Sequence, residues 1–452
     1  MKIIIAGCGK IGTTLIDTLD KENHDITVID VDSSRVQNIS DKYDVMCIVG
    51  DAKSASLLME ADVDKSDLMI AVTDNDEENL TICLIAKNLG VKNTIARVRN
   101  PIYSESIKLI QHSLGLSMAI NPELETANEI LRTLRFKSAE QVETFAKSRM
   151  EILTCYVEEG TPICNVKIKD YFNKTKTKIF VCALKRGDDV FIPNGDFEIK
   201  AGDTLSFVAT AKEARDFFKK MGYDTGKVND LAIIGGGKLG YNLAKKAIDS
   251  GIPIKIVDKS NERCKELIEL LPNADVIMGD GSDTSLLEEE GIFNYSAIAV
   301  TTDDDAKNTL ISMYLNKHAK NAKVITKIKR SDFEDLIYTL ELGSIFNPKY
   351  VTADHIIRYV RAMNNAVDDE VQSLCHVIDN KVEVLEFIIQ EDMQCLGKEL
   401  KSLKLKKDLL IAAVYRKGVG FNPSGEDTIE KGDNVLVITT NKGISRFADI
   451  FE

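Results

Sequence analysis

Short apolar runs alternate with amphipathic segments of helical period along much of the chain. In the first half, six apolar runs predict strands at residues 2–6, 25–30, 44–49, 67–73, 94–98 and 116–120. Segments of helical period, such as residues 79–90, separate these runs. Strands that alternate with helices are typical of βαβ units, so the pattern predicts an α/β fold with a parallel, doubly wound sheet.

The same pattern returns in the second half. The stretch IIIAGCGKIGTTL at residues 3–15 reappears as LAIIGGGKLGYNL at residues 231–243, and the glycines are displaced by 235 − 7 = 228 residues. Later landmarks keep their order in both halves: Asp30 and Asp258, Asp51 and Asp280, Thr73 and Thr301, and Arg97 and Lys327. We therefore expect two copies of one sheet domain.

The sequence pattern changes after each copy: the expected strands are separated by Gly-Asp and Lys-Gly turns instead of helices. It predicts a small, mostly antiparallel α+β domain that a terminal helix closes, at residues 211–222 in the first half and 441–451 in the second. The chain should thus contain four domains in the order A-B-A′-B′, with residues 222–230 joining the halves. The expected boundaries are 1–137, 138–222, 229–364 and 365–452.

Composition narrows the class of protein. The chain has 452 residues, of which 44% are hydrophobic and 29% charged, and no stretch approaches the roughly 18 consecutive apolar residues that cross a bilayer. The glycine loop follows MKIII directly and leaves no room for a signal peptide, so we expect a cytoplasmic protein. The net charge of −13 argues against nucleic acid as a partner. Nine scattered cysteines without a CxxC pair predict neither a disulfide framework nor a metal site.

The two glycine clusters have the context of a dinucleotide-binding fingerprint, with a strand before, a helix after and an acid at the end of the next strand. Gly7 permits a tight turn, Gly9 lets the backbone approach a pyrophosphate, and Gly12 allows close packing of helix and strand. Asp30 and Asp258 stand where a carboxylate accepts hydrogen bonds from ribose hydroxyls and repels a 2′-phosphate. The sequence therefore predicts two Rossmann-like domains that bind NAD(H), or alternatively ATP or ADP, in preference to NADP(H).

Polar residues follow the fourth strand of each copy, at the sheet edge where ligands bind. Thr73 and Asp74, with Thr301 and Thr302 in the repeat, are candidates for ligand contact, and the alternative is that they cap the next helix. Arg97 and Lys327 on the fifth strand are candidates for phosphate contact, and guanidinium is better suited because it binds phosphate bidentately. Differences between the copies indicate that the two sites need not share one ligand.

No catalytic constellation accompanies these loops. The five histidines are isolated, and the sequence contains no GxSxG elbow, HExxH motif or cysteine-histidine signature. The glycine loop is also not a Walker A motif, because isoleucine follows Lys10. We therefore expect a protein that binds a nucleotide without converting it, with no catalytic and no metal-binding residues.

Over essentially the whole chain, these motifs resemble the TrkA family, the regulatory subunits of Trk potassium-uptake systems with tandem RCK domains. The likeness rests on MKIIIAGCGKIG, DITVID, IVGDA, IAVTDNDEEN and IARVR, then on IIGGGKLG, IKIVD, VIMGDGSD and AVTTDDDAKN. It implies a non-enzymatic, cytoplasmic subunit on the inner face of the membrane, bound there through a membrane-spanning potassium transporter subunit. It also implies a homo-oligomer, either a dimer or a tetrameric ring, in which bound NAD(H), ATP or ADP biases the gate.

The resemblance also implies which residues contact the nucleotide. In the first site these are Gly7, Cys8, Gly9, Lys10, Ile11, Gly12, Asp30, Asp51, Thr73, Asp74 and Arg97. In the second site they are Gly235, Gly236, Gly237, Lys238, Leu239, Gly240, Asp258, Asp280, Thr301, Thr302 and Lys327. Two alternative functions remain at this point: an NAD-dependent oxidoreductase, and a small-molecule sensor that binds its effector in the small domains.

Overall fold

The computed structural model describes residues 1–452 with the exception of 101–102, 104–105, 108, 110, 112, 146–149, 330–333, 338–339, 341, 365–370, 379–380, 390–392, 394 and 445. Among the described residues, no helix combines the length and the apolar character needed to cross a membrane. The chain forms two compact units. One comprises Met1–Thr126 and Asn347–Val360, and the other comprises Ala127–Phe346 and Arg361–Glu452.

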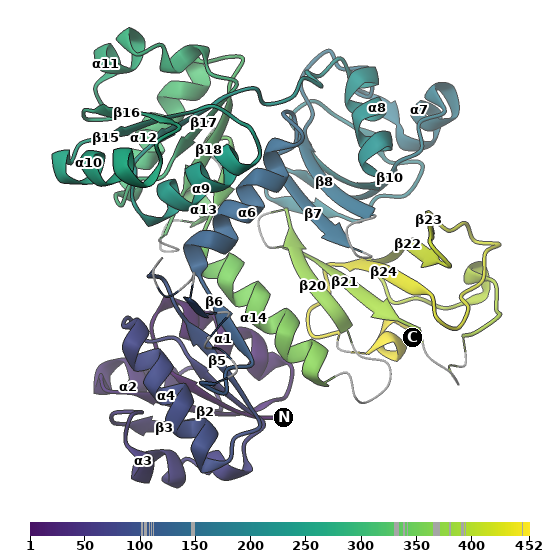
Figure 1. Ribbon diagram of the computed structural model, residues 1–452. Coiled ribbons are helices and arrows are strands. Elements are labelled where there is room, and N and C mark those ends of the chain that lie inside the picture. Colours follow the sequence, from purple (N-terminus) through teal and green to yellow (C-terminus); the bar gives the residue numbers. More distant parts are fainter. Residues whose placement is uncertain are drawn as a thin grey trace. The chain divides into compact units, whose positions relative to one another are not determined.

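The first unit contains a parallel sheet of six strands in the order β3-β2-β1-β4-β5-β6. The strands are β1 (Lys2–Ala6), β2 (Asp25–Asp30), β3 (Met46–Val49), β4 (Leu68–Ala71), β5 (Asn93–Arg97) and β6 (Met118–Ile120). The helices between them include α1 (Lys10–Lys21), α2 (Ser33–Ser40), α3 (Ala55–Glu60) and α4 (Asp76–Leu89) (Figure 1). The predicted doubly wound sheet is confirmed, because strand order reverses at β1 and leaves a crevice at its carboxyl end.

The second unit contains the same sheet again, in the order β16-β15-β14-β17-β18-β19. Its strands are β14 (Leu231–Ile234), β15 (Ile254–Asp258), β16 (Ala274–Met278), β17 (Ala297–Val300), β18 (Lys323–Lys327) and β19 (Ser344–Phe346). Its helices are α9 (Lys238–Asp249), α10 (Asn261–Leu270), α11 (Thr284–Glu289), α12 (Asp305–His318) and α13 (Glu334–Ile337). The predicted duplication of the fold is thereby confirmed.

The register of the strands corrects one pairing between the copies. Ile3 pairs with Leu68 in the first sheet, whereas Leu231 pairs with Ala297 in the second. The displacement is therefore 231 − 3 = 228 residues at the first strand but 297 − 68 = 229 at the fourth. As a result Thr302, not Thr301, is the structural counterpart of Thr73. One extra residue between the second strand and Asp280 causes this shift.

Each small domain is built on an antiparallel sheet of five strands, as predicted. The first has the order β11-β10-β13-β8-β7, with β7 (Gln141–Phe145), β8 (Met150–Tyr156), β10 (Phe180–Arg186), β11 (Asp189–Phe191) and β13 (Thr204–Ala209). It also contains β9 (Val166–Lys167), β12 (Glu198–Ile199), α7 (Ile168–Thr175) and α8 (Ala211–Met221). The second has the order β20-β21-β24-β22-β23, with β20 (Val371–Val377), β21 (Val382–Ile388), β22 (Leu409–Arg416), β23 (Val419–Phe421) and β24 (Asn434–Thr439).

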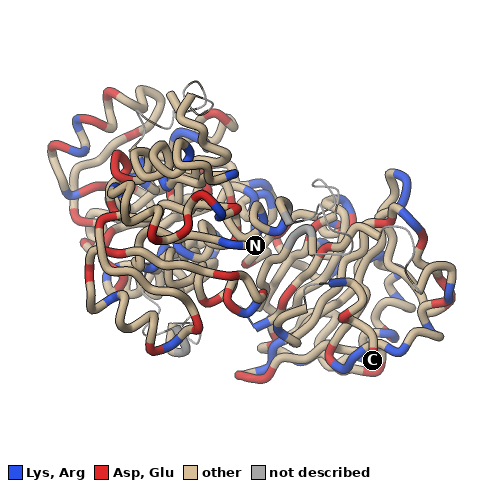
Figure 2. Tube along the Cα trace, turned by 90° about the horizontal axis from the view of Figure 1, so that it is seen from below, with Lys and Arg blue, Asp and Glu red and all other residues tan. Residues whose placement is uncertain are grey.

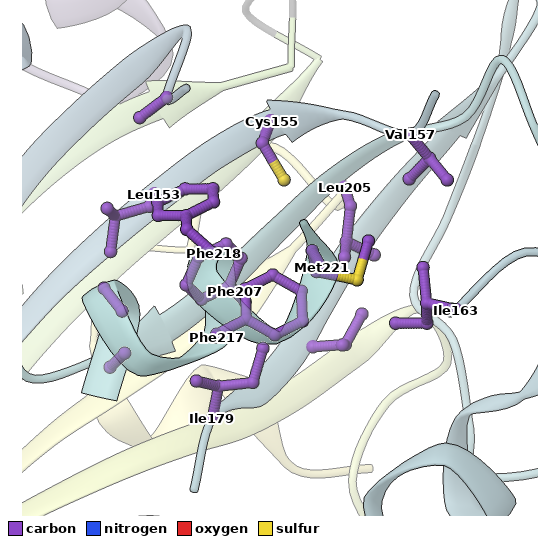
Figure 3. Packing of buried hydrophobic residues seen from close by; sticks show 14 of the residues in the cluster. Leu153, Cys155, Val157, Ile163, Ile179, Leu205, Phe207, Phe217, Phe218 and Met221 are labelled. Carbon is purple, nitrogen blue, oxygen red and sulfur yellow. The ribbon is translucent and has the colours of Figure 1, made fainter. Parts of the chain in front are cut away.

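The terminal helix forms in only one of the two small domains. Helix α8 begins with a capping box between Thr210 and Glu213, and it buries Phe217 and Phe218 against the sheet. Figure 3 shows these rings with Phe207 in the core, and the ring centroids of Phe207 and Phe217 lie 4.8 Å apart. The predicted helix at 441–451 is wrong over its described residues, which contain only the short 3-10 helix Phe447–Ile450. The cause is local, because Gly443 has a φ of +81° and interrupts the helical path.

The sheets of the two small domains share one hydrophobic core. Both carry a bulge at the matching strand, between Val181 and Ala183 in β10 and between Ile411 and Ala413 in β22. The extra residues, Cys182 and Ala412, are fully buried in this common core. The small domains of the two halves are thus packed against each other within the second unit.

Helix α6 (Pro122–Leu134) connects the first copy to its small domain and supplies part of the other copy's core. Ala127, Ile130 and Leu134 are buried in one cluster with Leu231 and Ile233 of the second sheet. Figure 1 shows α6 beside that sheet. In the same way, α14 (Pro348–Asn364) follows the second sheet, but its residues up to Val360 belong to the unit of the first sheet. The sequence pattern did not predict this exchange of helices.

Candidate functional site

The net negative charge of the protein limits where an anion can bind. Figure 2 shows acidic and basic positions interspersed along the trace, and the chain carries a net charge of −13. An anion bound to such a protein needs local geometry instead of a broad basic surface. The loops after β1 and β14 are the places where the sequence predicts that geometry.

The first loop requires glycine at two of its three glycine positions. Gly7 has a φ of +107°, and a Cβ atom there would lie 2.9 Å from the backbone nitrogen of Thr73. A Cβ on Gly12 would lie 1.9 Å from the carbonyl oxygen of Gly7, so α1 packs directly on the loop. A Cβ on Gly9 would meet no atom within 4 Å. Steric fit therefore explains Gly7 and Gly12, while Gly9 leaves open space above the backbone where a ligand can approach.

The second loop repeats this arrangement. Gly235 has a φ of +102°, and its Cβ would lie 2.8 Å from the backbone nitrogen of Thr302. A Cβ on Gly240 would lie 2.1 Å from the carbonyl oxygen of Gly235, and one on Gly237 would meet nothing within 4 Å. Gly9 and Gly237 thus leave open space above the backbone of each loop.

Helices α1 and α9 begin at these open glycines. Gly9 and Gly237 are the N-cap residues, and neither helix has a side-chain cap. The side chains of Ile11 and Leu239 are buried in the core, so these residues offer only their backbone amides to a ligand. Lys10 and Lys238 begin the helices with exposed side chains. Amides at a helix start attract a phosphate through their partial positive charge.

Asp30 lies directly beside the first loop, as predicted for a ribose-binding acid. Its Oδ2 atom accepts the N–H of Cys8 at 2.6 Å, and Oδ1 accepts the N–H of Asp32 at 2.9 Å. Each carboxylate oxygen has a second lone pair that can accept a ligand hydroxyl. Burial, together with the nearby charge of Asp30, raises the pKa of the Cys8 thiol to about 12. Cys8 therefore stays a neutral thiol, and its backbone amide is the group that serves the loop.

Asp258 repeats this contact in the second copy. It accepts the N–H of Gly236 at 2.7 Å and the N–H of Ser260 at 2.9 Å. A Cβ on Gly236, the counterpart of Cys8, would lie 2.4 Å from a methyl carbon of Leu267. The two acids are thus equivalent in the two copies.

Asp51 and Asp280, the next pair of predicted ligand contacts, form hydrogen bonds within their own turns. Asp51 accepts the N–H of Lys53 at 2.9 Å and also forms an ion pair with its ammonium group. Asp280 accepts hydrogen bonds from the N–H and hydroxyl of Ser282, and these bonds, together with Lys307, lower its pKa to about 2. Both acids stabilise the turn before the next helix, and their contact with a ligand stays a prediction.

An asparagine missed by the sequence analysis organises the edge beyond the first loop. The Oδ1 atom of Asn79 accepts both the N–H and the hydroxyl of Thr73 at 2.8 Å, and its Nδ2 donates to the carbonyl of Arg97 at 3.0 Å. Asn308 makes the same connections between Thr302 and Lys327. The signal was a buried amide at matching positions of the two repeats, inside segments otherwise typical of an amphipathic helix.

Thr301 does not face the crevice. Its side chain is buried, and the hydroxyl donates to the carbonyl oxygen of Gly235 at 2.7 Å. It therefore stabilises the loop from within, at the place that Val72 occupies in the first copy. Its predicted ligand contact has no geometric support, whereas Thr302 takes the position expected for it.

The cation on the fifth strand differs between the copies. The guanidinium of Arg97 is buried, and Nη2 contacts Oδ1 of Asp74 at 3.3 Å. Its Nε atom is buried without a hydrogen-bond partner. Burial and the charge of neighbouring Arg99 lower the pKa of Arg97. Arg99 is itself paired with Glu123. An orphaned buried donor of this kind points to a ligand acceptor.

In the second copy, Lys327 is held by the protein. Its ammonium group donates to the carbonyl of Thr301 and to Asp303, both at 3.1 Å. Asp303 also pairs with Lys329 at 2.5 Å. Burial alone would raise the pKa of Asp303, but the hydrogen bond from Lys329 and the charge of Lys327 lower it to about 2. The carboxylate is thus charged and bound to two ammonium groups.

Arg263 is a further residue of the second loop that the sequence analysis missed. Its Nε donates to the carbonyl oxygen of Gly236 at 2.7 Å, and its guanidinium lies 5.8 Å from the ring centroid of Tyr241. In the first copy, Arg35 instead pairs with Asp32 at 3.4 Å. The second loop is therefore fixed by a side chain that has no equivalent contact in the first.

Over the part of the chain that the structure describes, no group of three or more His, Cys, Asp or Glu side chains is arranged to hold a metal ion. Each copy thus has an uncapped helix start, a carboxylate bonded to the loop backbone, and a buried cation at the end of the fifth strand. This arrangement fits an adenine nucleotide or dinucleotide at each copy.

Comparison with protein families agrees with the duplication. The TrkA-N domain matches residues 3–122 and 231–348, and the TrkA-C domain matches residues 155–222 and 384–452. The chain is 31% identical to the Trk system potassium uptake protein TrkA homolog of Archaeoglobus fulgidus, with all of both chains covered. It is 28% identical to the Trk system potassium uptake protein TrkA of Vibrio alginolyticus, with 98% of this chain and 96% of the relative covered.

Solved structures of similar fold are RCK proteins. The GsuK channel aligns with a TM-score of 0.61 and 18% identity over 98% of this chain and 77% of its own. The GsuK channel bound to NAD gives 0.60 and 18% over the same shares. The structure of GsuK bound to ADP gives 0.51 and 16% over 81% of this chain and 70% of its own. At these identities the likeness establishes the fold.

Proposed function

The chain belongs to the TrkA family, with tandem TrkA-N and TrkA-C domains, and from this premise we propose that it is the nucleotide-binding regulatory subunit of a Trk-type potassium-uptake system. It binds NAD(H), ATP or ADP at the two glycine loops and catalyses no reaction. Its nucleotide-dependent change of conformation gates a membrane-spanning transporter subunit. In this proposal the protein is cytoplasmic and sits at the inner face of the membrane through that partner.

One observation carries the proposal: both loops combine an open glycine, an uncapped helix start and a carboxylate bonded to the loop backbone. The two amides beside Asp30 and Asp258 position the acid for a ribose, and the helix starts suit a diphosphate. Solved proteins of the same fold carry NAD or ADP, and these are the ligands that we assign here.

The division into domains 1–137, 138–222, 229–364 and 365–452 is part of the proposal. So is assembly into a homo-oligomer, as a dimer or a tetrameric ring. Gating requires that the nucleotide bind the open and closed conformations with different affinity, and each tenfold difference biases the equilibrium by about 1.4 kcal/mol. Two sites in each of several subunits would add such differences.

Potassium flux into proteoliposomes tests the proposal. The cognate membrane subunit is reconstituted alone, with the wild-type chain, and with Asp30→Ala combined with Asp258→Ala. We expect flux to depend on added NADH, ATP or ADP only with the wild-type chain. Asp25→Ala is the matched control, because Asp25 lies at the opposite end of β2, exposed and 4.0 Å from Lys2. The proposal would be refuted if, with the wild-type chain present, the potassium flux did not change on addition of NADH, ATP or ADP.

A further inference from the structure

The two nucleotide sites differ in the hydrogen-bonding capacity of the cation on the fifth strand. Arg97 and Lys327 occupy the same place, since Asn79 and Asn308 bond to their carbonyl groups in the same way. What surrounds the two charged groups is different. The inference below rests on the proposed function, because it assigns ligands to the same two sites.

Arg97 has unused donors. A guanidinium carries five N–H bonds in a planar fork. In the described part of the chain, the protein contact of this group is the one between Nη2 and Asp74 at 3.3 Å, and Nε is buried without a partner. Only 7% of Arg97 is exposed, whereas 86% of the Asp74 side chain is exposed. Asp74 can therefore turn toward water and leave the guanidinium to a ligand.

Most hydrogen-bond donors of the Lys327 ammonium group are engaged by the protein. An ammonium group has three donors, and the bonds to the carbonyl of Thr301 and to Asp303, both at 3.1 Å, engage two of them. Lys329 holds the same oxygen of Asp303 at 2.5 Å. The Asp303 side chain is about as exposed as that of Asp74, at 85%, but a phosphate that reached Lys327 would have to separate its carboxylate from two ammonium groups. At the first site it would replace a single contact of 3.3 Å.

The order of the strands shows which part of a ligand meets these cations. Asp30 ends β2 and holds the ribose side, the loop follows β1 and holds the diphosphate, and Arg97 ends β5, two strands beyond β1. Neighbouring strands lie about 4.8 Å apart, so Arg97 stands about 10 Å past the loop. The γ-phosphate of ATP extends in this direction, beyond the two phosphates that the loop holds, whereas a dinucleotide places a nucleoside there.

We infer that the first site is selective for adenosine triphosphate, which Arg97 recognises by its γ-phosphate, and that the second site takes the adenine dinucleotide NAD(H). Guanidinium binds phosphate bidentately, through donors that the protein leaves unused at Arg97. The bridge of Asp303 with two lysines disfavours a γ-phosphate beside Lys327.

Isothermal titration calorimetry of the full chain tests the assignment. Asp258→Ala isolates the first site and Asp30→Ala isolates the second, and each variant is titrated with ATP, ADP, AMP and NADH. At the first site we expect ATP to bind at least tenfold more tightly than ADP, and Arg97→Lys in the same background to reduce this ratio to about threefold or less. At the second site we expect NADH to bind most tightly, with ATP and ADP within about threefold of each other.

Equal preference for ATP over ADP at the two sites, or tighter binding of NADH at the first, would overturn the assignment and leave the proposed function intact. Absence of any nucleotide binding by the wild-type chain would overturn both. Photolabelling of the unmodified protein with 8-azido-ATP gives the same comparison without substitutions. We expect ATP to displace the label on peptides of residues 1–126 at least tenfold more effectively than ADP, and equal displacement by the two would contradict the inference.

Discussion

The ammonium group of Lys323 donates a hydrogen bond of 2.9 Å to the carbonyl oxygen of Thr133, near the end of helix α6. The same group donates to the carbonyl oxygens of Phe136, at 2.7 Å, and Ala139. Lys323 begins β18 of the second sheet, while all three acceptors come from the first half of the chain. One buried cation thus fixes the end of α6 and the segment that leads into the first small domain.

We predict that this contact makes stability depend on pH. Complete burial, opposed by the charge of Glu140, lowers the pKa of Lys323 to about 7, whereas an unfolded lysine titrates near pH 10.4. Between these values the unfolded chain binds a proton that the folded chain does not, so the free energy of unfolding rises with pH. Thermal unfolding at pH 7, 8 and 9 should shift the Tm of the wild type upward relative to that of Lys323→Met. A constant difference would contradict this prediction.

Removing the buried amide of Asn79 should destabilise the first unit. Asn79→Ala leaves the N–H of Thr73 and the carbonyl of Arg97 without these partners, and we expect a loss of about 2 kcal/mol in the free energy of unfolding. Denaturant unfolding measures it. Asn88→Ala is the control on the same helix, because Asn88 is exposed and its amide donates to the carbonyl of Leu84, within the helix itself. An equal loss in both variants would mean that helix propensity causes the effect.

Two glycines of one loop should respond differently to alanine. A Cβ on Gly12 would lie 1.9 Å from the carbonyl oxygen of Gly7, so Gly12→Ala should destabilise the fold by about 1–3 kcal/mol. Gly9→Ala meets open space and should leave the Tm unchanged. It should nevertheless weaken nucleotide binding at the first site about tenfold, because the methyl group lies where the ligand approaches. Calorimetry in the Asp258→Ala background measures this, and unchanged affinity would show that the ligand lies elsewhere.

Arg263 should matter for the second site alone. Arg263→Ala removes the hydrogen bond to the carbonyl of Gly236 and the contact with Tyr241, and a loosened loop should bind its nucleotide about tenfold more weakly. The measurement uses the Asp30→Ala background. Arg35→Ala, tested at the first site with Asp258→Ala, is the control, since Arg35 pairs with Asp32 near the surface. Comparable losses in both would indicate direct ligand contact by either arginine.

Local pattern was sufficient for the parallel sheets. All six predicted strands of the first copy form, and the run 2–6 coincides with β1, because apolar runs between glycine turns bury on both faces of such a sheet. The sequence pattern gave wrong predictions where a single residue determines the local structure. The extra residue before Asp280 moved the match of Thr73 from Thr301 to Thr302, and Gly443 interrupts the expected terminal helix.

Long-range contacts were beyond the reach of the sequence pattern. The apolar positions Ala127, Ile130 and Leu134 predict an amphipathic helix but not the sheet that receives it. Likewise, nothing local indicates that Lys323 is buried or that Asn79 faces Thr73. The glycine loops and their acids were found because spacing along the chain encodes them. The hydrogen bonds and ion pairs of Arg97 and Lys327 were not predicted, because they depend on neighbours elsewhere in the fold.

The placement of α6 constrains how such a chain can be shortened. A polypeptide that ended within residues 222–230 would expose Ala127, Ile130 and Leu134, whose binding surface is made by Leu231 and Ile233. A half-length form would therefore have to pair with a second molecule and trade this helix with it.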